Sequence, residues 1–146
     1  MQDIEEFDKL KTKVLKYILY KKRTEQEIRQ KFSENAGNNL ENVIEYLKEN
    51  DYINDNRYIE KAILEFKKLK NLSIKELKYK LLSKGLSKSQ IEDYIYLHKE
   101  ELEDYELQSA TTLYNKKETI MEPDEIYNYL QKKGYMEQTI RSLQNE

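Results

Sequence analysis

The sequence has few of the residues that cross-linked, metal-binding or β-rich proteins use. It contains no cysteine, one histidine, three glycines and one proline among 146 residues. Without cysteine there is no disulfide, no thiolate nucleophile and no cysteine-ligated zinc. The few glycines and the single proline leave little material for hairpin turns. These absences favour a helical fold, and nothing in the composition calls for a cofactor or a metal.

The chain also lacks the apolar segments that carry a protein into or across a membrane. Its opening stretch, MQDIEEFDKL, is acidic and unlike a secretory signal. No apolar run approaches the roughly 18 residues that a membrane-spanning helix needs. We therefore expect a cytoplasmic protein with no membrane partner.

The usual catalytic residues are scarce. His98, the single histidine, lies in YLHKEELEDYE at an expected helix junction, where a structural or exposed role is favoured over metal binding or general-base work. The isolated glycines build no phosphate-binding loop of the G-x-x-x-x-G-K-[ST] type. Carboxylates are plentiful, but most fall on polar helix faces, where ion pairing is favoured over a paired acid site. We expect a protein that is not an enzyme.

One stretch of the sequence occurs twice. Residues 75–91 read KELKYKLLSKGLSKSQI, and residues 124–140, forty-nine positions later, read DEIYNYLQKKGYMEQTI. Without a gap, Leu81 aligns with Leu130 and Gly85 aligns with Gly134. A weaker copy lies another 49 residues upstream. Similarity at a fixed period of this length is typical of helical repeat proteins.

Each copy begins with a helix start signal. Thr24 with Glu27, and Ser73 with Glu76, are spaced as capping boxes, in which a hydroxyl and a carboxylate satisfy free amides at a helix start. In the last copy Pro123 suits the first helical position. Further helix caps are expected at Asn39, at Asp55, and at Ser87 together with Gln90.

Each copy also carries a stop signal. Gly85 and Gly134 stand where a helix needs a left-handed residue to end, and Gly37 has this role in the first copy, one residue late. Asn71, in KLKNLS, tolerates the left-handed conformation and is the expected stop for the preceding long helix.

Long helices are expected before these short ones, over residues 5–21, 55–70 and 99–117. A long helix followed by two short ones, three times over, predicts an all-α protein of three tandem three-helix repeats of about 49 residues. The predicted repeats are residues 1–54, 55–98 and 99–146. Because each repeat has a small core, neighbours must stack, which predicts an elongated, curved solenoid.

Charge is unevenly distributed although the formal net charge is only −2. Residues 9–31 hold nine Lys/Arg against two Glu, and residues 61–88 hold nine Lys against two Glu. Residues 92–106 hold seven Asp/Glu against one Lys. Solvated helix faces account for part of this pattern. The alternative is two basic surfaces separated by an acidic belt, which suits a partner carrying both phosphate and protein charge.

The thirteen tyrosines raise the question of base stacking, because aromatic rings interleaved with lysine hold single strands. Tyr17, Tyr58, Tyr94 and Tyr135 fall on or beside apolar stripes, so packing is favoured for them. Tyr79, between two lysines and off the stripe, is the best candidate for an exposed ring.

A helix-turn-helix reader is a further alternative, since LLSKGLSKSQIEDYIYL fits its outline. The second helix of this segment would enter the major groove with Glu92 and Asp93, and only Lys88 would support it. This composition argues against specific reading of duplex DNA.

Several segments together resemble one known family, the RecX regulators of the RecA recombinase. They are RTEQEIRQKF, YLKENDYINDNRYIEKAI, KKLKNLSIKELKYKLLSKGL and the later KKGY, and the likeness spans roughly residues 8–144. Each alone also reads as a generic helix boundary, so their order and the 49-residue period carry the resemblance. Asn71 stands where members often have glycine, and many members are more basic.

The resemblance implies a non-enzymatic inhibitor that lies in the groove of the RecA filament on single-stranded DNA. It would suppress ATP hydrolysis, strand exchange and the co-protease activity of the SOS response. We expect a monomer, and the small net charge predicts only weak or indirect contact with single-stranded DNA. The alternatives are an autonomous DNA-binding protein and a generic helical protein-interaction module.

The basic face of the middle repeat is the expected contact surface for such a partner. Arg57 is interpreted as an ion pair that closes a repeat junction rather than as a partner contact. The predicted contact residues are Lys67, Lys68, Lys70, Lys75, Lys78 and Lys84.

Overall fold

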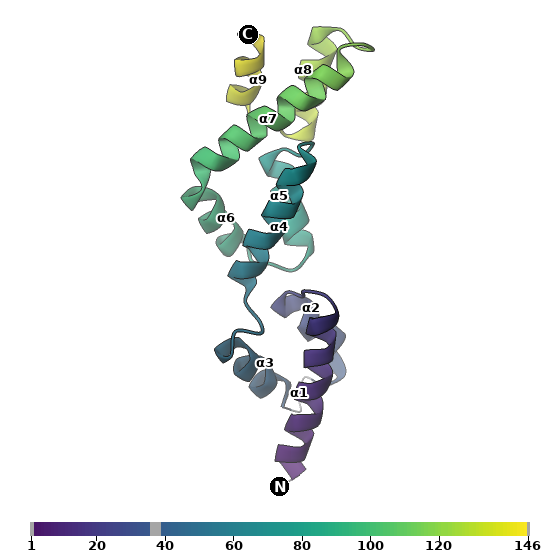
Figure 1. Cartoon of the computed structure of the whole chain (residues 1–146), viewed down its shortest axis with the longest axis vertical. Helices are drawn as coiled ribbons and strands as arrows, with labels where there is room; N and C mark the ends of the chain where they lie inside the picture. Colours follow the sequence, from purple (N-terminus) through teal and green to yellow (C-terminus); the bar gives the residue numbers. More distant parts are fainter. Residues whose placement is uncertain (1, 36–38, 146) are drawn as a thin grey trace.

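The structure, a computed structural model, describes residues 2–35 and 39–145 and shows an all-α protein (Figure 1). These residues form nine α-helices and one short 3-10 helix, Ser33–Asn35, and contain no strand, so the predicted all-α class is confirmed. The α-helices are α1 (Gln2–Tyr20), α2 (Glu25–Lys31), α3 (Leu40–Glu49), α4 (Asp55–Leu69), α5 (Ile74–Ser83), α6 (Lys88–Leu97), α7 (Lys99–Lys117), α8 (Pro123–Lys133) and α9 (Glu137–Gln144). Gly37, an expected stop, lies outside the described residues.

No helix in the described ranges combines the length and the apolar content that crossing a bilayer demands.

The helices follow one another along an elongated molecule whose termini lie at opposite ends (Figure 1). A long helix is followed by two shorter ones in the triplets α1–α3, α4–α6 and α7–α9. We use the word triplet for these groups of helices. The division into three repeats, their boundaries at 54/55 and 98/99, and the curved solenoid shape stay predictions.

Three apolar clusters form the core, and α7 contributes to two of them. Leu102 and Tyr105, from the first half of α7, pack with Ile63, Leu77 and other residues of the middle triplet. The second half of α7 packs against α8 and the residues around α9. The first triplet has a cluster of its own. The long helix of the last triplet therefore binds that triplet to the middle one.

The same hydroxyl contact joins the first triplet to the second and the second to the third. Thr24 Oγ1 accepts a hydrogen bond from the Glu27 amide at 3.1 Å, and it donates one to the Lys84 carbonyl at 2.6 Å. Ser73 Oγ likewise accepts from its own helix and donates to the Lys133 carbonyl at 3.1 Å. Both hydroxyl residues are fully buried. Donors and acceptors of the two junctions are related by the 49-residue period.

A glycine follows each acceptor carbonyl. Gly85 has φ +87° and Gly134 has φ +102°, which is the left-handed region that other residues enter only at a cost. A Cβ atom at Gly85 would lie 2.5 Å from Gln26 Cβ, and one at Gly134 would lie 2.9 Å from Lys75 Cδ. Glycine is therefore required twice over, for the helix ending and for the close approach of the neighbouring triplet.

The junction between the second and third triplets also contains a buried carboxylate. Glu106, on α7, is fully buried. Its Oε2 accepts from the Ile74 amide at 2.9 Å, and its Oε1 accepts from the Met136 amide at 2.8 Å and the Thr139 hydroxyl at 2.7 Å. The two amides lie at the starts of α5 and α9, where helix dipoles favour negative charge. One carboxylate thus ties three helices together.

A hydroxyl pair adds to this junction. Ser109 Oγ donates to the Leu72 carbonyl at 3.1 Å and lies 2.6 Å from the Tyr135 hydroxyl. Because Ser109 has one hydroxyl proton, the Tyr135 hydroxyl is the donor between the two side chains. Burial raises the pKa of Tyr135 far above its ordinary value, so the phenol stays protonated and able to donate.

The ends of α4 differ from the prediction by one residue. Asn54, not Asp55, is the cap, and its side chain accepts from the Arg57 amide at 3.0 Å. Lys70, not Asn71, takes the left-handed conformation, with φ 47°. The helix ends one residue earlier than expected, so the strained position falls on the lysine.

Two other predicted caps are only partly right. Asn39 occupies the cap position of α3, but its backbone is left-handed (φ 64°), a geometry in which the side chain makes no capping hydrogen bond. At α6, Ser87 accepts from the Gln90 amide at 3.0 Å, and its hydroxyl lies 3.2 Å from Gln90 Oε1. The reciprocal half of that capping box is not formed. The boxes at Thr24 and Ser73 are complete.

We predict that Ser73→Ala destabilises the protein more than Ser87→Ala. Both changes remove a helix cap, worth about 1 kcal/mol. Only Ser73→Ala also leaves the part-buried Lys133 carbonyl without its donor, which adds about 1–3 kcal/mol. Urea unfolding followed by circular dichroism measures both free energies. Equal losses would show that the junction bond contributes nothing.

We also predict that Glu106→Gln destabilises the protein by about 2–3 kcal/mol. The glutamine amide group would point an N–H donor at groups that now donate hydrogen bonds to the Glu106 carboxylate. Asp104→Asn is the matched control, because Asp104 is exposed on the same helix, and its effect should stay within about 0.5 kcal/mol. The same denaturant titration compares the two variants, and a Glu106→Gln protein as stable as the control contradicts the assignment.

Candidate partner and nucleic-acid interfaces

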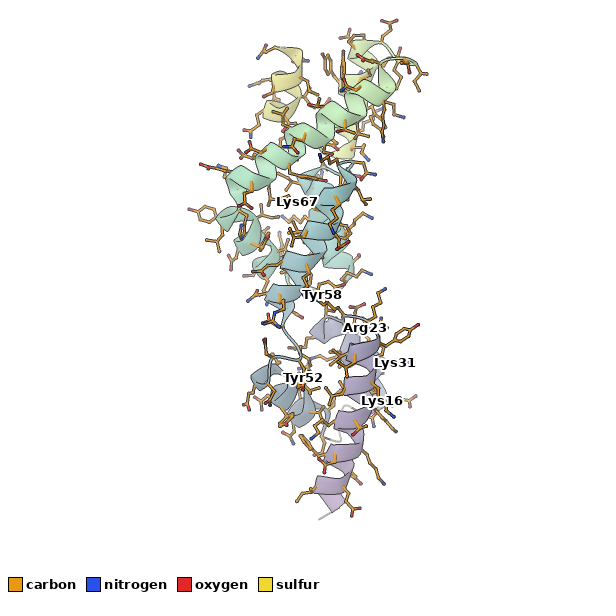
Figure 2. The ribbon with its side chains drawn as sticks, viewed as in Figure 1. Lys16, Arg23, Lys31, Tyr52, Tyr58 and Lys67 are labelled. Atoms are coloured by element: carbon orange, nitrogen blue, oxygen red, sulfur yellow. The ribbon has the colours of Figure 1, made fainter. Side chains whose placement is uncertain are left out.

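Three of the six predicted contact lysines share a groove. Lys67, Lys68 and Lys70 lie at the end of α4 and face the first half of α7 across a groove of about 470 Å³; Figure 2 shows Lys67 on α4. The groove is also lined by Leu64, Glu101, Asp104, Tyr105 and Gln108. It combines an exposed leucine, three cations and two carboxylates, and so offers a mixed surface of the kind found at protein interfaces.

The other three predicted lysines lie at helix or triplet junctions. The stem of Lys75 packs over Gly134. Lys78 Nζ lies 2.8 Å from Glu92 Oε1, and its hydrogen bond lowers the pKa of Glu92. Lys84 provides the carbonyl that accepts the junction bond. The structure therefore does not bring the six lysines onto one face, and their contact with a partner stays a prediction.

A second basic surface lies between the end of α1 and the start of α4. It is a cleft of about 470 Å³ that contains five cations, Lys21, Lys22, Arg23, Arg57 and Lys61, and one acid, Asp51. We call it the α1/α4 cleft. Its remaining lining residues are Ile18, Leu19, Tyr20, Tyr52, Asn54 and Tyr58. Figure 2 shows Arg23, Tyr52 and Tyr58 at this junction, with Lys16 and Lys31 farther along the first triplet.

The only acid of the cleft is already paired. Arg57 binds the Asp51 carboxylate, and Asn54 Nδ2 donates to its other oxygen at 2.9 Å. The interpretation of Arg57 as an ion pair is therefore confirmed. Within residues 2–35 and 39–145, no ion pair joins Lys22 or Lys61 to a carboxylate.

Lys22 and Lys61 line the same cleft. Interactions with Lys61, together with burial and the charge of Arg57, lower the pKa of Lys22. The Arg23 guanidinium stacks over the Tyr17 ring at 4.1 Å, and its buried Nε has no protein partner in the described part of the chain. The cleft therefore holds more positive charge than its own residues neutralise.

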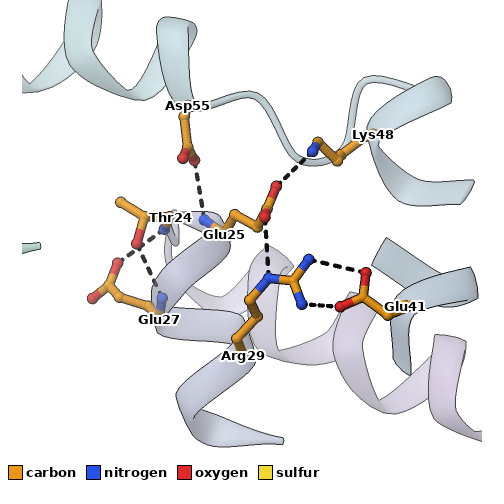
Figure 3. A network of polar contacts seen from close by, with 7 residues as sticks. All are labelled: Thr24, Glu25, Glu27, Arg29, Glu41, Lys48 and Asp55. Carbon is orange, nitrogen blue, oxygen red and sulfur yellow. Dashed lines mark hydrogen bonds and ion pairs between the residues drawn. The ribbon is translucent and has the colours of Figure 1, made fainter. Parts of the chain in front are cut away.

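In the polar network beside the cleft, by contrast, every charged side chain has a partner (Figure 3). The Glu25 carboxylate lies 3.1 Å from Arg29 Nε and 2.7 Å from Lys48 Nζ. Arg29 also forms a bidentate ion pair with Glu41. Burial by itself would raise the pKa of Glu25, but the hydrogen bonds from Lys48 and Arg29 hold it below its ordinary value. The Glu25 amide donates to Asp55 at 3.0 Å. These residues build the first junction.

Exposed aromatic rings lie in and near the cleft. Tyr20 is 86% exposed and Tyr52 is 50% exposed, whereas Tyr58 is half-buried. Tyr79, the ring predicted to be exposed, is 61% exposed. Tyr135, predicted to pack, is buried in the third apolar cluster.

The sequence interpretation missed the α1/α4 cleft. Four of its five cations fall within two separate basic runs, residues 9–31 and 61–88, and Arg57 lies outside both. Nothing local shows that the runs meet. The available signal was the stretch YKKR at residues 20–23, where an aromatic residue is followed by three cations at the end of an amphipathic helix.

His98 has a structural contact and no metal neighbourhood. Its ring stacks on Tyr94 with centroids 4.1 Å apart. Across the described residues, no group of three or more His, Asp or Glu side chains is arranged to hold a metal ion.

Comparison with known proteins points to one group of relatives. No protein-family model matches the chain. It is 32% identical to the regulatory protein RecX of Clostridium beijerinckii over 143 residues, which cover 92% of this chain and 66% of the relative. It is 30% identical to the regulatory protein RecX of Staphylococcus carnosus, with 99% of this chain and 58% of the relative covered. The chain thus spans less than two thirds of the length of these curated relatives.

Two solved structures share the fold. The crystal structure of RecX from Lactobacillus salivarius superposes with a TM-score of 0.79 at 21% identity, covering 97% of this chain and 96% of that one. A crystal structure of regulatory protein RecX gives a TM-score of 0.78 at 19% identity, covering 97% and 74%. At these identities the agreement concerns the all-α fold.

Proposed function

Because the chain belongs to the RecX family of regulatory proteins, we propose that it regulates a RecA recombinase. It acts by binding, without catalysis of its own, and does so in the cytoplasm. The observation that carries the proposal is the similarity to RecX proteins over nine tenths of the chain.

In this proposal the protein lies in the helical groove of the RecA filament on single-stranded DNA. The elongated arrangement of the triplets supports this placement (Figure 1). A molecule whose ends lie far apart can contact several filament subunits, whereas a compact domain of the same size reaches fewer. Occupying the groove would suppress ATP hydrolysis, strand exchange and the co-protease activity of the SOS response.

The groove between α4 and α7 is the proposed contact with the recombinase. Lys67, Lys68 and Lys70 supply positive charge there, and Leu64, which is 57% exposed, supplies apolar area. Lys68 has an exposed partner, Glu65, at 3.4 Å. An exposed pair of this kind contributes little to stability, so Lys68 can exchange Glu65 for a carboxylate of the partner at small cost.

We expect the triple variant Lys67→Glu, Lys68→Glu, Lys70→Glu to lose inhibition of the single-strand-dependent ATPase of the cognate RecA. Reversed charge repels a complementary surface, and the half-inhibitory concentration should rise about tenfold or more. The measurement is an ATPase titration, with far-UV circular dichroism to confirm the fold.

The matched control is Lys99→Glu, Lys116→Glu, Lys132→Glu. These lysines are exposed on α7 and α8, and the control changes the net charge by the same amount. Its inhibition should stay near that of the unmodified protein. Equal inhibition by the two variants would show that the groove is not the contact with the recombinase. Failure of the unmodified protein to inhibit the ATPase would overturn the proposed function.

A further inference from the structure

The groove between α4 and α7 continues along α7 beyond the three lysines. A second groove segment, of about 380 Å³, shares two lining residues with the first, Lys70 and Gln108. Its other lining residues are Leu107, Thr111 and Thr112. We call the two segments together the α4/α7 groove. Along α7 it extends from residue 101 to residue 112, which is about 16 Å at roughly 1.5 Å per residue. This length matches a helix of about three turns.

The side chains that α7 contributes to the groove lie on one face of that helix. They stand at positions 101, 104, 105, 108, 111 and 112, where neighbours on a helix surface are three or four residues apart. On α4, Leu64, Lys67 and Lys68 have the same spacing. Two helices that present such stripes on either side of a groove form a seat for a third helix.

Part of the α4/α7 groove is apolar. Leu64 is 57% exposed, and Leu107 is partly exposed. The hydroxyls of Thr111 and Thr112 donate to carbonyls of their own helix at 2.8 Å and 2.9 Å, so their protons are already used. These residues suit the apolar stripe of an amphipathic helix.

The charges of the groove are divided between its two sides. The end of α4 contributes only cations, which are Lys67, Lys68 and Lys70, and α7 contributes only acids, which are Glu101 and Asp104. Among residues 2–35 and 39–145, no ion pair engages Lys67, Lys70 or Asp104. A helix that complements the groove therefore carries acids on the edge toward α4 and a base on the edge toward α7.

We infer that the α4/α7 groove binds an amphipathic helix of the partner recombinase, with acids on one edge of its apolar stripe and a base on the other. The lysines of α4 would receive the acids, and Glu101 and Asp104 would receive the base. The inference rests on the proposed function, which supplies the source of the helix. It adds that the acids of α7 contribute to binding as well as the lysines.

The test uses the full chain and three fluorescein-labelled synthetic peptides of about 14 residues that share one leucine stripe. A lactam bridge on the opposite face keeps them helical, since a peptide of this length is marginal alone. The mixed peptide has glutamates on one edge and lysines on the other. In the acidic peptide glutamine replaces the lysines, and in the basic peptide glutamine replaces the glutamates.

Fluorescence anisotropy should show that the mixed peptide binds most tightly, with the other two weaker by about fivefold or more. A helix that lacks one set of charges leaves one side of the groove without a partner. Equal affinities of the three peptides, or no binding of any of them, overturn the inference.

Charge-neutralising variants assign the two edges. The variant Lys67→Gln, Lys70→Gln should weaken binding of the mixed and acidic peptides by about fivefold and leave the basic peptide within about twofold. The variant Glu101→Gln, Asp104→Asn should weaken the mixed and basic peptides and spare the acidic one. If either variant weakens all three peptides equally, the assignment of the edges is wrong.

Two exposed leucines of α4 give a matched pair for the apolar contact. Leu64→Ala should weaken all three peptides by about fivefold or more, because it removes apolar area from the groove. Leu69→Ala is the control, since Leu69 is 60% exposed on the same helix and does not line the groove. It should stay within about twofold of the unmodified protein, and equal effects of the two changes contradict the site.

Two further measurements identify the source of the helix. Added to the ATPase titration, the mixed peptide should relieve the inhibition, and inhibition that is unchanged by a saturating peptide contradicts a recombinase helix in this groove. Sedimentation of the unmodified protein should show a monomer. A dimer that Leu64→Ala dissociates would mean that a second copy of the chain fills the groove, which also overturns the inference. The peptide titrations contain no recombinase, so their failure leaves the ATPase test of the proposed function unaffected.

Discussion

One buried hydroxyl at each junction holds this array together, because it serves two triplets at once. It accepts from the first turn of its own helix, as an N-cap, and donates to the last carbonyl of a helix in the next triplet. Aspartate, otherwise a good cap, cannot donate in this position. The glycine after that carbonyl permits the approach. Helix start and helix stop signals from different triplets therefore form one contact, repeated at the 49-residue period.

The sequence predicts these helix caps and helix stops but not the contact between them. Capping boxes at Thr24 and Ser73 and the stops at Gly85 and Gly134 are local patterns, and they are readable from a single chain. Their contact across 60 residues is tertiary, and no spacing rule predicts it. Glu106 shows the same limit: within a run of acids it looks like a solvated residue, yet the junction buries it completely.

The candidate surfaces could likewise be predicted only in part. Composition shows two basic runs, but the fold decides which lysines act together. It places Lys67, Lys68 and Lys70 in one groove and pairs Lys78 with Glu92. It also joins the residues after α1 to those of α4, which creates a cleft that neither run indicates alone. Lysines that look equivalent in the sequence thus have different neighbours, and electrostatic function depends on neighbours.

The elongated arrangement of the triplets suits a regulator that lies along a nucleoprotein filament, which is the central claim of our account. Electron cryomicroscopy of the protein bound to RecA filaments on single-stranded DNA tests it most directly. We expect continuous density along the helical groove, with the long axis of the molecule following the groove across several subunits. Density confined to filament ends, or to the outer surface, would contradict the account.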